Sequence, residues 1–391
     1  MKNIFGYFLI FISVVLLAYA VYTTTQVTKK NQTFSSYTFL TSSWEKYRDQ
    51  FINKDGRVID YSQGGITTSE AQSYAMLRAV FIGDKTTFDS VWNWTKNDMK
   101  RPHDNLFGWR WGKTTKGGYG FETQNDMNSA ADADSDIALA LILAAHRWNV
   151  PGYLDSAKQI LKDFWTIEVG QANGKNYVIA GNWAKVNGNL IINPSYFSPY
   201  AYRIFAAVDK KHDWNSLISP GYGLLNHASQ NILDKQTSTG LPPDWIAVAS
   251  SSGQMAATNI PNLTTNYGYE AVRIPWRVAL DYQWNSSPDA INYLRNSFTY
   301  LTNLYKQNSK LGAIYSHDGS ELNGTESPTM YATSLAYLMV ENPALAKKMY
   351  QEKILTLYSN DTNSFNSQLP YYEQNWLWLG AALYNKALKQ I

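Results

Sequence analysis

The chain has 391 residues, 45% of them hydrophobic and 17% charged, with a formal net charge of +3. This composition provides apolar material for one large core, and the small net charge does not indicate a nucleic-acid or acidic partner. Cysteine is absent, which excludes disulfides, thiolate metal ligands and a lipid-modified cysteine.

Residues 4–22 are uncharged and mostly apolar. This segment exceeds the roughly 7–15 residues of a signal-peptide core and approaches the length of a membrane-spanning helix. The sequence at 18–20 (AYA) offers a cleavage site, so a cleaved signal peptide is the alternative to an uncleaved anchor. We therefore expect an anchor or signal segment with a polar spacer at 1–36 and one folded domain at 37–391. The lysines on both sides of the segment do not settle its orientation.

A helix is predicted over residues 68–82, where hydroxyl residues suited to an N-cap precede apolar positions spaced by three and four. Glu70 falls at its start, on the same stripe as Tyr74, Leu77 and Phe81. Desolvation of a glutamate on an apolar face raises its pKa, and a protonated carboxyl group can act as a general acid. The alternative is a capping glutamate that faces solvent.

Asp132, Asp134 and Asp136 run directly into a second apolar helix, predicted over residues 134–148. The helix dipole favours negative charge in this position. An N-cap needs one aspartate rather than three, although acidic first turns are common in helices of purely structural role. The run superficially resembles a calcium loop, but the glycine and glutamate of such a loop are replaced by Ile137 and Leu143. The five histidines lack metal-ligand spacing, so we expect neither a metal nor a cofactor.

Helical periodicity recurs about twelve times along the chain after residue 36. The predicted helices cover residues 37–51, 68–82, 86–99, 134–148, 152–168, 198–207, 213–234, 271–283, 288–307, 328–341, 343–358 and 371–388. The longer intervening stretches, 100–131, 170–197 and 236–268, are rich in glycine, asparagine and tryptophan. We expect them to be irregular loops that carry binding residues.

Six short motifs in order along the chain resemble glycoside hydrolase family 8, a family of bacterial endoglucanases, cellulases and chitosanases. The family's acid motif, roughly S-E-G-Q-x-Y-G-M, and its A-[ST]-D-[AG]-D-x-x-[IM]-A signature stand at 69–76 (SEAQSYAM) and 130–138 (AADADSDIA). The others stand at 193–196 (NPSY), 243–245 (PDW), 269–273 (YEAVR) and 371–372 (YY). The resemblance covers roughly residues 37–388. It implies an all-α fold, an (α/α)6 barrel of about twelve helices.

The resemblance also implies roles for four residues of an inverting hydrolase, which uses two carboxyl groups on opposite sides of the scissile bond. Glu70 matches the proton donor, and Asp132 matches the residue that holds the sugar in a distorted ring shape. Asp134 is then expected to cap the helix or anchor the site. Tyr196 matches a residue near the attacking water.

The main departure from the family lies at the catalytic base. Many members have aspartate where this chain has Glu270, whose carboxylate sits one methylene further from the backbone. Other members place the base in an inserted loop, which makes Asp244, the only acid of residues 236–268, a second candidate. Asp281 on the following helix is expected to be structural. Smaller departures are alanines at 71 and 75 for the family's glycines, and at 131 for serine or threonine.

Fourteen tryptophans and 28 tyrosines suit a glycan-binding cleft, because aromatic faces stack against sugar rings. Trp109, Trp111 and Trp183 are the predicted sugar platforms, with core burial as the alternative for each. Arg273 is predicted to pair with Glu270 or Asp132 and keep one of them ionised, or to form a structural salt bridge.

The sequence therefore predicts an inverting endo-β-1,4-glycanase that acts on glucan or a related exopolysaccharide. We expect an exported monomer whose partners are a β-linked polysaccharide and, through the N-terminal segment, a membrane. Two alternatives remain: a glycan-binding protein that has lost turnover because Glu270 is not a working base, and a polysaccharide lyase on the same barrel.

Overall fold

The computed structural model describes residues 36–234 and 237–390, and its described residues from Leu40 onward form one compact unit. The described part contains thirteen α-helices. They are α2 (Ser36–Phe51), α3 (Ser69–Ile82), α4 (Lys85–Trp94), α5 (Ala131–Trp148), α6 (Pro151–Glu168), α7 (Pro199–Val208), α8 (Ile218–Gln230), α9 (Ile274–Asn285), α10 (Pro288–Ser297), α11 (Thr299–Asn308), α12 (Pro328–Glu341), α13 (Pro343–Met349) and α14 (Tyr371–Tyr384).

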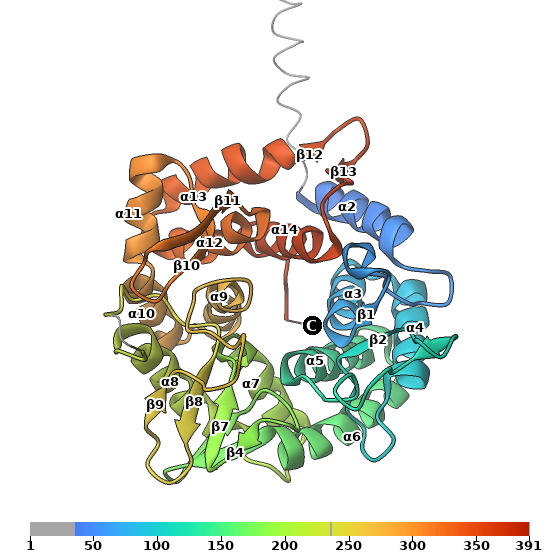
Figure 1. Cartoon of the computed structure of the whole chain (residues 1–391). Helices are drawn as coiled ribbons and strands as arrows, with labels where there is room; N and C mark the ends of the chain where they lie inside the picture. Colours follow the sequence, from blue (N-terminus) through green and yellow to red (C-terminus); the bar gives the residue numbers. More distant parts are fainter. Residues whose placement is uncertain (1–35, 235–236, 391) are drawn as a thin grey trace, which may run out of the picture. The chain divides into compact units, whose positions relative to one another are not determined.

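Six of these helices form a closed inner ring, in the order α3, α5, α7, α9, α12 and α14. Each packs against the next, and α14 returns to α3 (Figure 1). Helices α4, α6, α8, α10 and α13 each pack outside the inner helix that precedes them in the chain. The carbonyl of Leu40 in α2 accepts a hydrogen bond from the indole of Trp378 in α14 (2.9 Å). The unit is therefore an (α/α)6 barrel, as the sequence predicts.

Burial explains why the inner helices lack a polar face. In α5, every residue from Ala131 to Ala144 is buried, and α12 is buried from Thr329 to Leu338. A helix surrounded by others on all sides is apolar all round, whereas an outer helix keeps one solvent-facing side. Residues at the N-terminal ends of α3, α5, α9 and α14 all line one cavity, so these inner helices run in the same direction. Their N-termini consequently meet at one end of the barrel, and this end carries the site.

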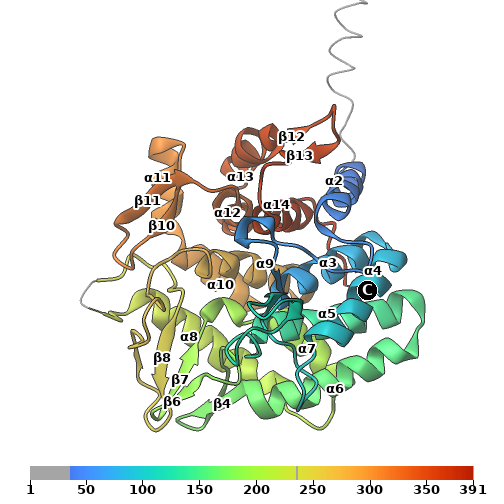
Figure 2. The same cartoon turned by 45° about the vertical axis from the view of Figure 1, so that its right-hand side comes forward.

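Short strands lie in the loops between the helices, including the three stretches that the sequence predicts to be irregular. The sheets are β1–β2–β3 (Thr67–Thr68, Arg110–Lys113, Tyr119–Gly120), β4–β5 (Val169–Ala172, Lys175–Val178), β6–β7–β8–β9 (Lys185–Val186, Asn189–Ile192, Ile246–Ala249, Met255–Ala256), β10–β11 (Gly312–Tyr315, Glu321–Glu326) and β12–β13 (Tyr358–Ser359, Ser364–Phe365). All pairs are antiparallel. Strands β7 and β8 lie beside α8 in both views (Figure 2). Residues 100–131, 170–197 and 236–268 are therefore partly ordered as sheet.

Several predicted helix boundaries differ from the structure, and three of the differences show a physical cause or bear on the site. Helix α5 starts at Ala131, so Asp132 lies inside its first turn. The pattern predicted over 288–307 is two helices, because the backbone leaves helical geometry at Phe298 (φ −113°, ψ 14°). The predicted helix at 343–358 continues beyond Met349 only as a π-helical turn, Tyr350–Ile354, and a 3₁₀ turn, Leu355–Leu357.

The predicted N-terminal anchor lies outside the described residues. Between residues 36 and 390, apart from the undescribed 235–236, no helix combines the length and apolarity needed to span a bilayer.

Candidate active site

A cavity of about 510 Å³ opens at the N-terminal end of the inner ring. Three of its carboxylates come from inner-helix segments: Glu70 in α3, Asp132 in α5 and Glu270 before α9. The remaining lining residues are mostly hydroxyl-bearing or aromatic: Asp60, Ser62, Gln63, Thr68, Ser69, Trp109, Ala130, Tyr196, Tyr269, Pro370, Tyr371, Tyr372 and Glu373. The lining thus combines acids with aromatic rings, the two groups that the sequence assigns to glycan chemistry.

Glu70 is the second residue of α3, and Thr68 caps that helix by accepting a hydrogen bond from the backbone N–H of Ala71 (3.1 Å). The glutamate does not serve as a cap. Its Oε1 accepts a hydrogen bond from the hydroxyl of Tyr371 (2.9 Å), and its Oε2 accepts one from Arg273 (2.8 Å). The alternative of a solvent-facing capping glutamate is therefore wrong, since the side chain is held between two partners at the cavity wall and is only 22% exposed.

The three aspartates at the start of α5 have three different partners. Asp132 accepts a hydrogen bond from Nη1 of Arg273 (2.8 Å). Asp134 accepts one from the backbone N–H of Phe107 (3.0 Å), so it anchors a loop and does not cap the helix. Asp136 forms a buried two-pronged ion pair with Arg277 (2.9 and 2.8 Å). Of the three aspartates only Asp132 lines the cavity, and none of them caps the helix, whose N-cap is Ala130.

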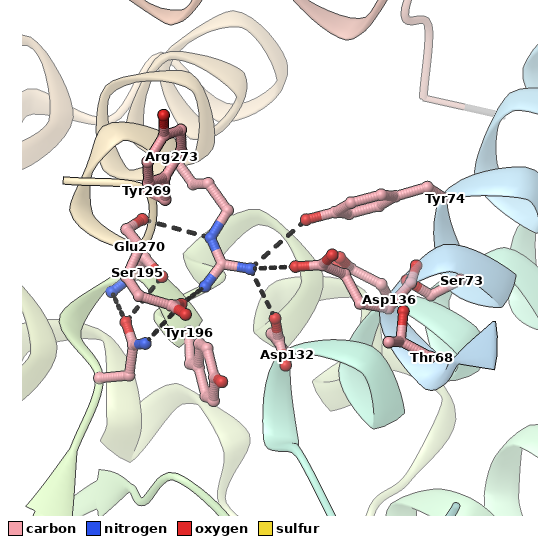
Figure 3. Close-up of polar contacts among 12 residues, drawn as sticks. Thr68, Ser73, Tyr74, Asp132, Asp136, Ser195, Tyr196, Tyr269, Glu270 and Arg273 are labelled. Atoms are coloured by element: carbon pink, nitrogen blue, oxygen red, sulfur yellow. Dashed lines mark hydrogen bonds and ion pairs between the residues drawn. The ribbon is translucent and has the colours of Figure 1, made fainter. Parts of the chain in front are cut away.

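Arg273 joins three of the cavity carboxylates, those of Glu70, Asp132 and Glu270. Its Nη1 pairs with Glu70 and Asp132, and its Nη2 pairs with Glu270. Figure 3 shows the guanidinium between Glu270 on one side and Asp132 on the other. The sequence predicts a pair with Glu270 or Asp132, and the structure contains both at once. Burial alone would lower the pKa of Arg273, but Glu270 and its other anionic neighbours raise it well above the ordinary value.

Burial raises the pKa of Glu70 to about 7. Arg273 opposes this shift by favouring the charged carboxylate, whereas the negative charges of Asp132 and Glu270 add to it. A carboxyl group with a pKa near neutrality carries a proton often enough to donate it, yet releases it readily, which is what general acid catalysis requires.

Glu270 immediately precedes the 3₁₀ turn Ala271–Arg273, and its side chain is 34% exposed at the cavity. Its carboxylate accepts hydrogen bonds from Arg273 and from the side-chain amide of Asn193 (2.8 Å). The longer side chain is therefore fixed, with its carboxylate in the cavity that contains Glu70.

Glu70 and Glu270 bind different terminal nitrogens of one guanidinium. Two hydrogen bonds and the width of that group separate their nearest oxygens by at most about 8 Å. Inverting glycosidases hold their two carboxyl groups about 6.5–9.5 Å apart, which leaves room for a water molecule. The geometry admits this spacing.

Asp244 does not line the cavity. It is buried, and one of its carboxylate oxygens accepts three backbone N–H groups, those of Gly268, Glu270 and Ala271. Asp281 is likewise buried and pairs with Arg203 and Tyr222, in agreement with its predicted structural role.

Of the three predicted sugar platforms, only Trp109 lines the cavity. Trp111 is stacked on Tyr119 with ring centroids 5.4 Å apart, and the guanidinium carbon of Arg57 lies 4.5 Å from its ring centre. Trp183 lies outside the cavity lining, 6.1 Å from the ring of Trp245. Trp245 in turn contacts Tyr196, which does line the cavity.

Sequence reasoning missed two side chains that contact the proposed acid and base, Tyr371 and Asn193. Both lie in motifs that the sequence displays. Tyr371 is 301 residues from its partner Glu70, however, and Asn193 is 77 residues from its partner Glu270. In residues 36–234 and 237–390, no group of three or more histidine, aspartate or glutamate side chains is arranged to hold a metal ion.

The family model for "Glycosyl hydrolases family 8" matches residues 10–380. Endoglucanase 2 of Ruminiclostridium josui is 28% identical over 351 residues, which cover 86% of this chain and 70% of that protein. The endoglucanase of Cellulomonas uda is 30% identical over 60% of this chain and 62% of its own length, so the chain spans less than two thirds of that relative.

Two solved structures of similar fold are 24% and 18% identical to this chain. The endo-1,4-D-glucanase of Vibrio fischeri ES114 superposes with a TM-score of 0.73 at 24% identity, covering 88% of this chain and 94% of that one. A cold-adapted family 8 xylanase superposes with a TM-score of 0.72 at 18% identity, covering 92% and 93%. Because the family match extends over nearly the whole chain, this protein belongs to the glycosyl hydrolases of family 8.

Proposed function

We propose that this protein is an inverting endo-β-1,4-glucanase that hydrolyses a cellulose-like glucan or a related exopolysaccharide. One observation carries the proposal: Glu70 and Glu270 face the same cavity, on opposite ends of the Arg273 guanidinium. An acid and a base on either side of a bound sugar are what inversion requires.

In the proposed reaction, Glu70 protonates the glycosidic oxygen as the bond from that oxygen to the anomeric carbon breaks. A water molecule attacks the same carbon from the opposite face, and Glu270 takes its proton. Asp132 holds the sugar in a distorted ring, and Tyr196 lies beside the attacking water. Each turnover leaves Glu70 ionised and Glu270 protonated, and exchange with solvent restores both.

The proposed substrate class rests on the cavity and on the relatives. Trp109, Tyr269 and Tyr372 supply aromatic lining, and such rings stack on pyranose faces. Several relatives with 28–30% identity are named endoglucanases. Proteins of the same fold include a xylanase and a β-1,3-1,4-glucanase, so fold alone does not select the polymer.

We also propose that residues 37–391 are the catalytic domain and that residues 1–36 export the chain and anchor it to the membrane, or direct its secretion if the segment is cleaved. The apolar run at 4–22 supports this proposal. A monomer suffices for catalysis, because the acid, the base and Arg273 all come from one chain.

Reducing-sugar assays across a panel of β-1,4 polysaccharides test the proposal. The panel contains carboxymethyl cellulose, mixed-linkage glucan, xylan and chitosan, with the Glu70→Gln and Glu270→Gln variants as inactive controls. With glucan we expect reducing ends to appear and the viscosity of the solution to fall rapidly, because internal cleavage shortens the polymer quickly. Oligosaccharide binding without turnover on any polymer would instead select the glycan-binding alternative, and products absorbing in the ultraviolet would select a lyase.

A further inference from the structure

The segment that carries Glu270 wraps around one carboxylate oxygen. Oδ1 of Asp244 accepts the backbone N–H groups of Gly268 (3.1 Å), Glu270 (3.2 Å) and Ala271 (2.7 Å). Three amide donors converging on one anion form a rigid concave turn. The segment 268–271 therefore takes its conformation from a side chain that lies outside the cavity.

Asp244 is itself held tightly. Its backbone N–H donates to the carbonyl of Asn266 (2.6 Å), and a Cβ added to Gly268 would lie 2.8 Å from the second carboxylate oxygen. Glycine at 268 thus permits the close approach between the carboxylate and the backbone. Burial raises the pKa of Asp244 to about 7, while the amide donors favour the ionised form.

Asn193 fixes the other end of the Glu270 side chain. Its Oδ1 accepts the backbone N–H and the hydroxyl of Ser195 (3.0 and 2.7 Å), which sets the orientation of the amide. Its Nδ2 consequently points at Glu270 and donates to Oε2 (2.8 Å). Asn193 is buried, so water does not readily replace this donor.

We propose that Asn193 and Asp244 are positioning residues that together seat the Glu270 carboxylate for catalysis, Asn193 through its amide and Asp244 through the backbone turn. This inference rests on the proposed function, in which Glu270 is the base. Glutamate has one more rotatable bond than aspartate, so it needs more restraint to reach one geometry. A small misplacement of a reacting group costs about 10²-fold in rate.

The charged and titratable groups around Glu270 influence how the enzyme's activity depends on pH. They are Arg273, Glu70, Asp132, Asp244, Tyr196 and Tyr372. Only Arg273 and Asn193 donate side-chain hydrogen bonds to the carboxylate among the contacts of the described residues. Removing the neutral Asn193 amide therefore weakens the stabilisation of the ionised base without altering any of these charges.

Steady-state kinetics of the full chain against pH test the role of Asn193. For Asn193→Ala we expect kcat to fall about 10²-fold with KM little changed. The acidic limb of the kcat profile should move up by about one pH unit, because a hydrogen bond to a charged group is lost. Asn193→Asp should move the limb further, because it places a negative charge beside the base.

Asp244 is tested by conservative rescue. Asp244→Asn keeps an acceptor oxygen for the three amides and should retain kcat within about tenfold of the parent. Asp244→Ala leaves those amides without the acceptor, so its kcat should fall to that of Asn193→Ala. Asn176→Ala is the matched control, since that asparagine contacts only Ser216 through its side-chain amide among the contacts described and lies outside the cavity lining.

Thermal unfolding of every variant separates positioning from folding, since a merely structural role lowers Tm without moving the pH limb. The inference is overturned if folded Asn193→Ala and Asp244→Ala keep the parent's kcat and pH profile. It is also overturned if Asp244→Asn is inactive while Glu270→Gln is active, because Asp244 would then be the base. A parent enzyme that hydrolyses no glycan would instead sink the proposed function.

Discussion

A single hydrogen bond of 2.8 Å joins Nη1 of Arg273 to Oε2 of Glu70. The proposed proton donor therefore rests against a buried cation, which favours its ionised form. Burial outweighs this attraction and raises the pKa of Glu70 to about 7. The pH range in which Glu70 can act as an acid is thus set by two opposed effects, burial and the charge of Arg273. Each effect has a measurable consequence.

The first prediction concerns the alkaline limb of activity. Because Glu70 must be protonated to act, kcat/KM should fall as pH rises through about 7. In Arg273→Gln, loss of the cation should raise the pKa of Glu70 and move this limb to higher pH, with lower activity overall. A pH–rate profile of both enzymes checks this. A limb that does not respond to the Arg273 substitution would contradict the assignment.

The second prediction concerns Glu70→Gln, which keeps size and polarity but cannot donate a carboxylic proton. General acid catalysis contributes about 10²–10⁴-fold, so we expect kcat on an unactivated glucan to fall by at least that order, with KM little changed. The alkaline limb of the pH–rate profile should also vanish, because the group that causes it is gone. Near-parental turnover would remove Glu70 as the acid.

The third prediction concerns Glu270→Ala. Without a base, hydrolysis should fall by at least about 10²-fold, while the truncation leaves space for a small anion. Azide should restore turnover by attacking the anomeric carbon directly, and the product should be a glycosyl azide of inverted configuration. Mass spectrometry and NMR identify it. Formation of the same product by Asp244→Ala but not Glu270→Ala would place the base at Asp244.

The sequence predicts the acid side of this site better than the base side, for physical reasons. The position of Glu70 follows from a local signal, the Thr68 cap and the apolar spacing of α3, and both are present. The three contacts of Arg273 depend on how the barrel closes, because its partners lie 203, 141 and 3 residues away. No local pattern encodes the longer two.

The tryptophans illustrate a second limit. Trp109 and Trp111 are two residues apart, so they would share a face if both lay in one strand. Strand β2 begins only at Arg110, and Trp111 pairs with Thr67 while its ring stacks on Tyr119. Where a short strand begins decides which ring reaches the cavity, and composition does not reveal that boundary.

The fourth prediction concerns the buried acid pair Asp134 and Glu168. Burial raises the pKa of Glu168 to about 8, and burial together with Glu168 raises that of Asp134 well above its usual value. The folded state therefore holds protons that the unfolded state releases above about pH 4.3. Stability should accordingly fall as pH rises from about 5 to 8.

The variant Glu168→Gln removes one of these groups, so its stability should fall less over the same range. We expect its Tm to exceed the parent's at pH 8, or to lie closer to it than at pH 5, by on the order of a few degrees. Thermal unfolding at both pH values measures this. Parallel pH dependence in the two proteins would show that Glu168 does not carry the effect.

The stereochemistry of the first product tests the central claim most directly. Proton NMR can follow the parent enzyme as it cleaves a β-1,4-linked gluco-oligosaccharide, before mutarotation mixes the anomers. With Glu70 as acid and Glu270 as base across one bound sugar, the new reducing end should appear first as the α-anomer. Initial release of the β-anomer would mean that one carboxylate attacks the sugar itself, and would contradict the account.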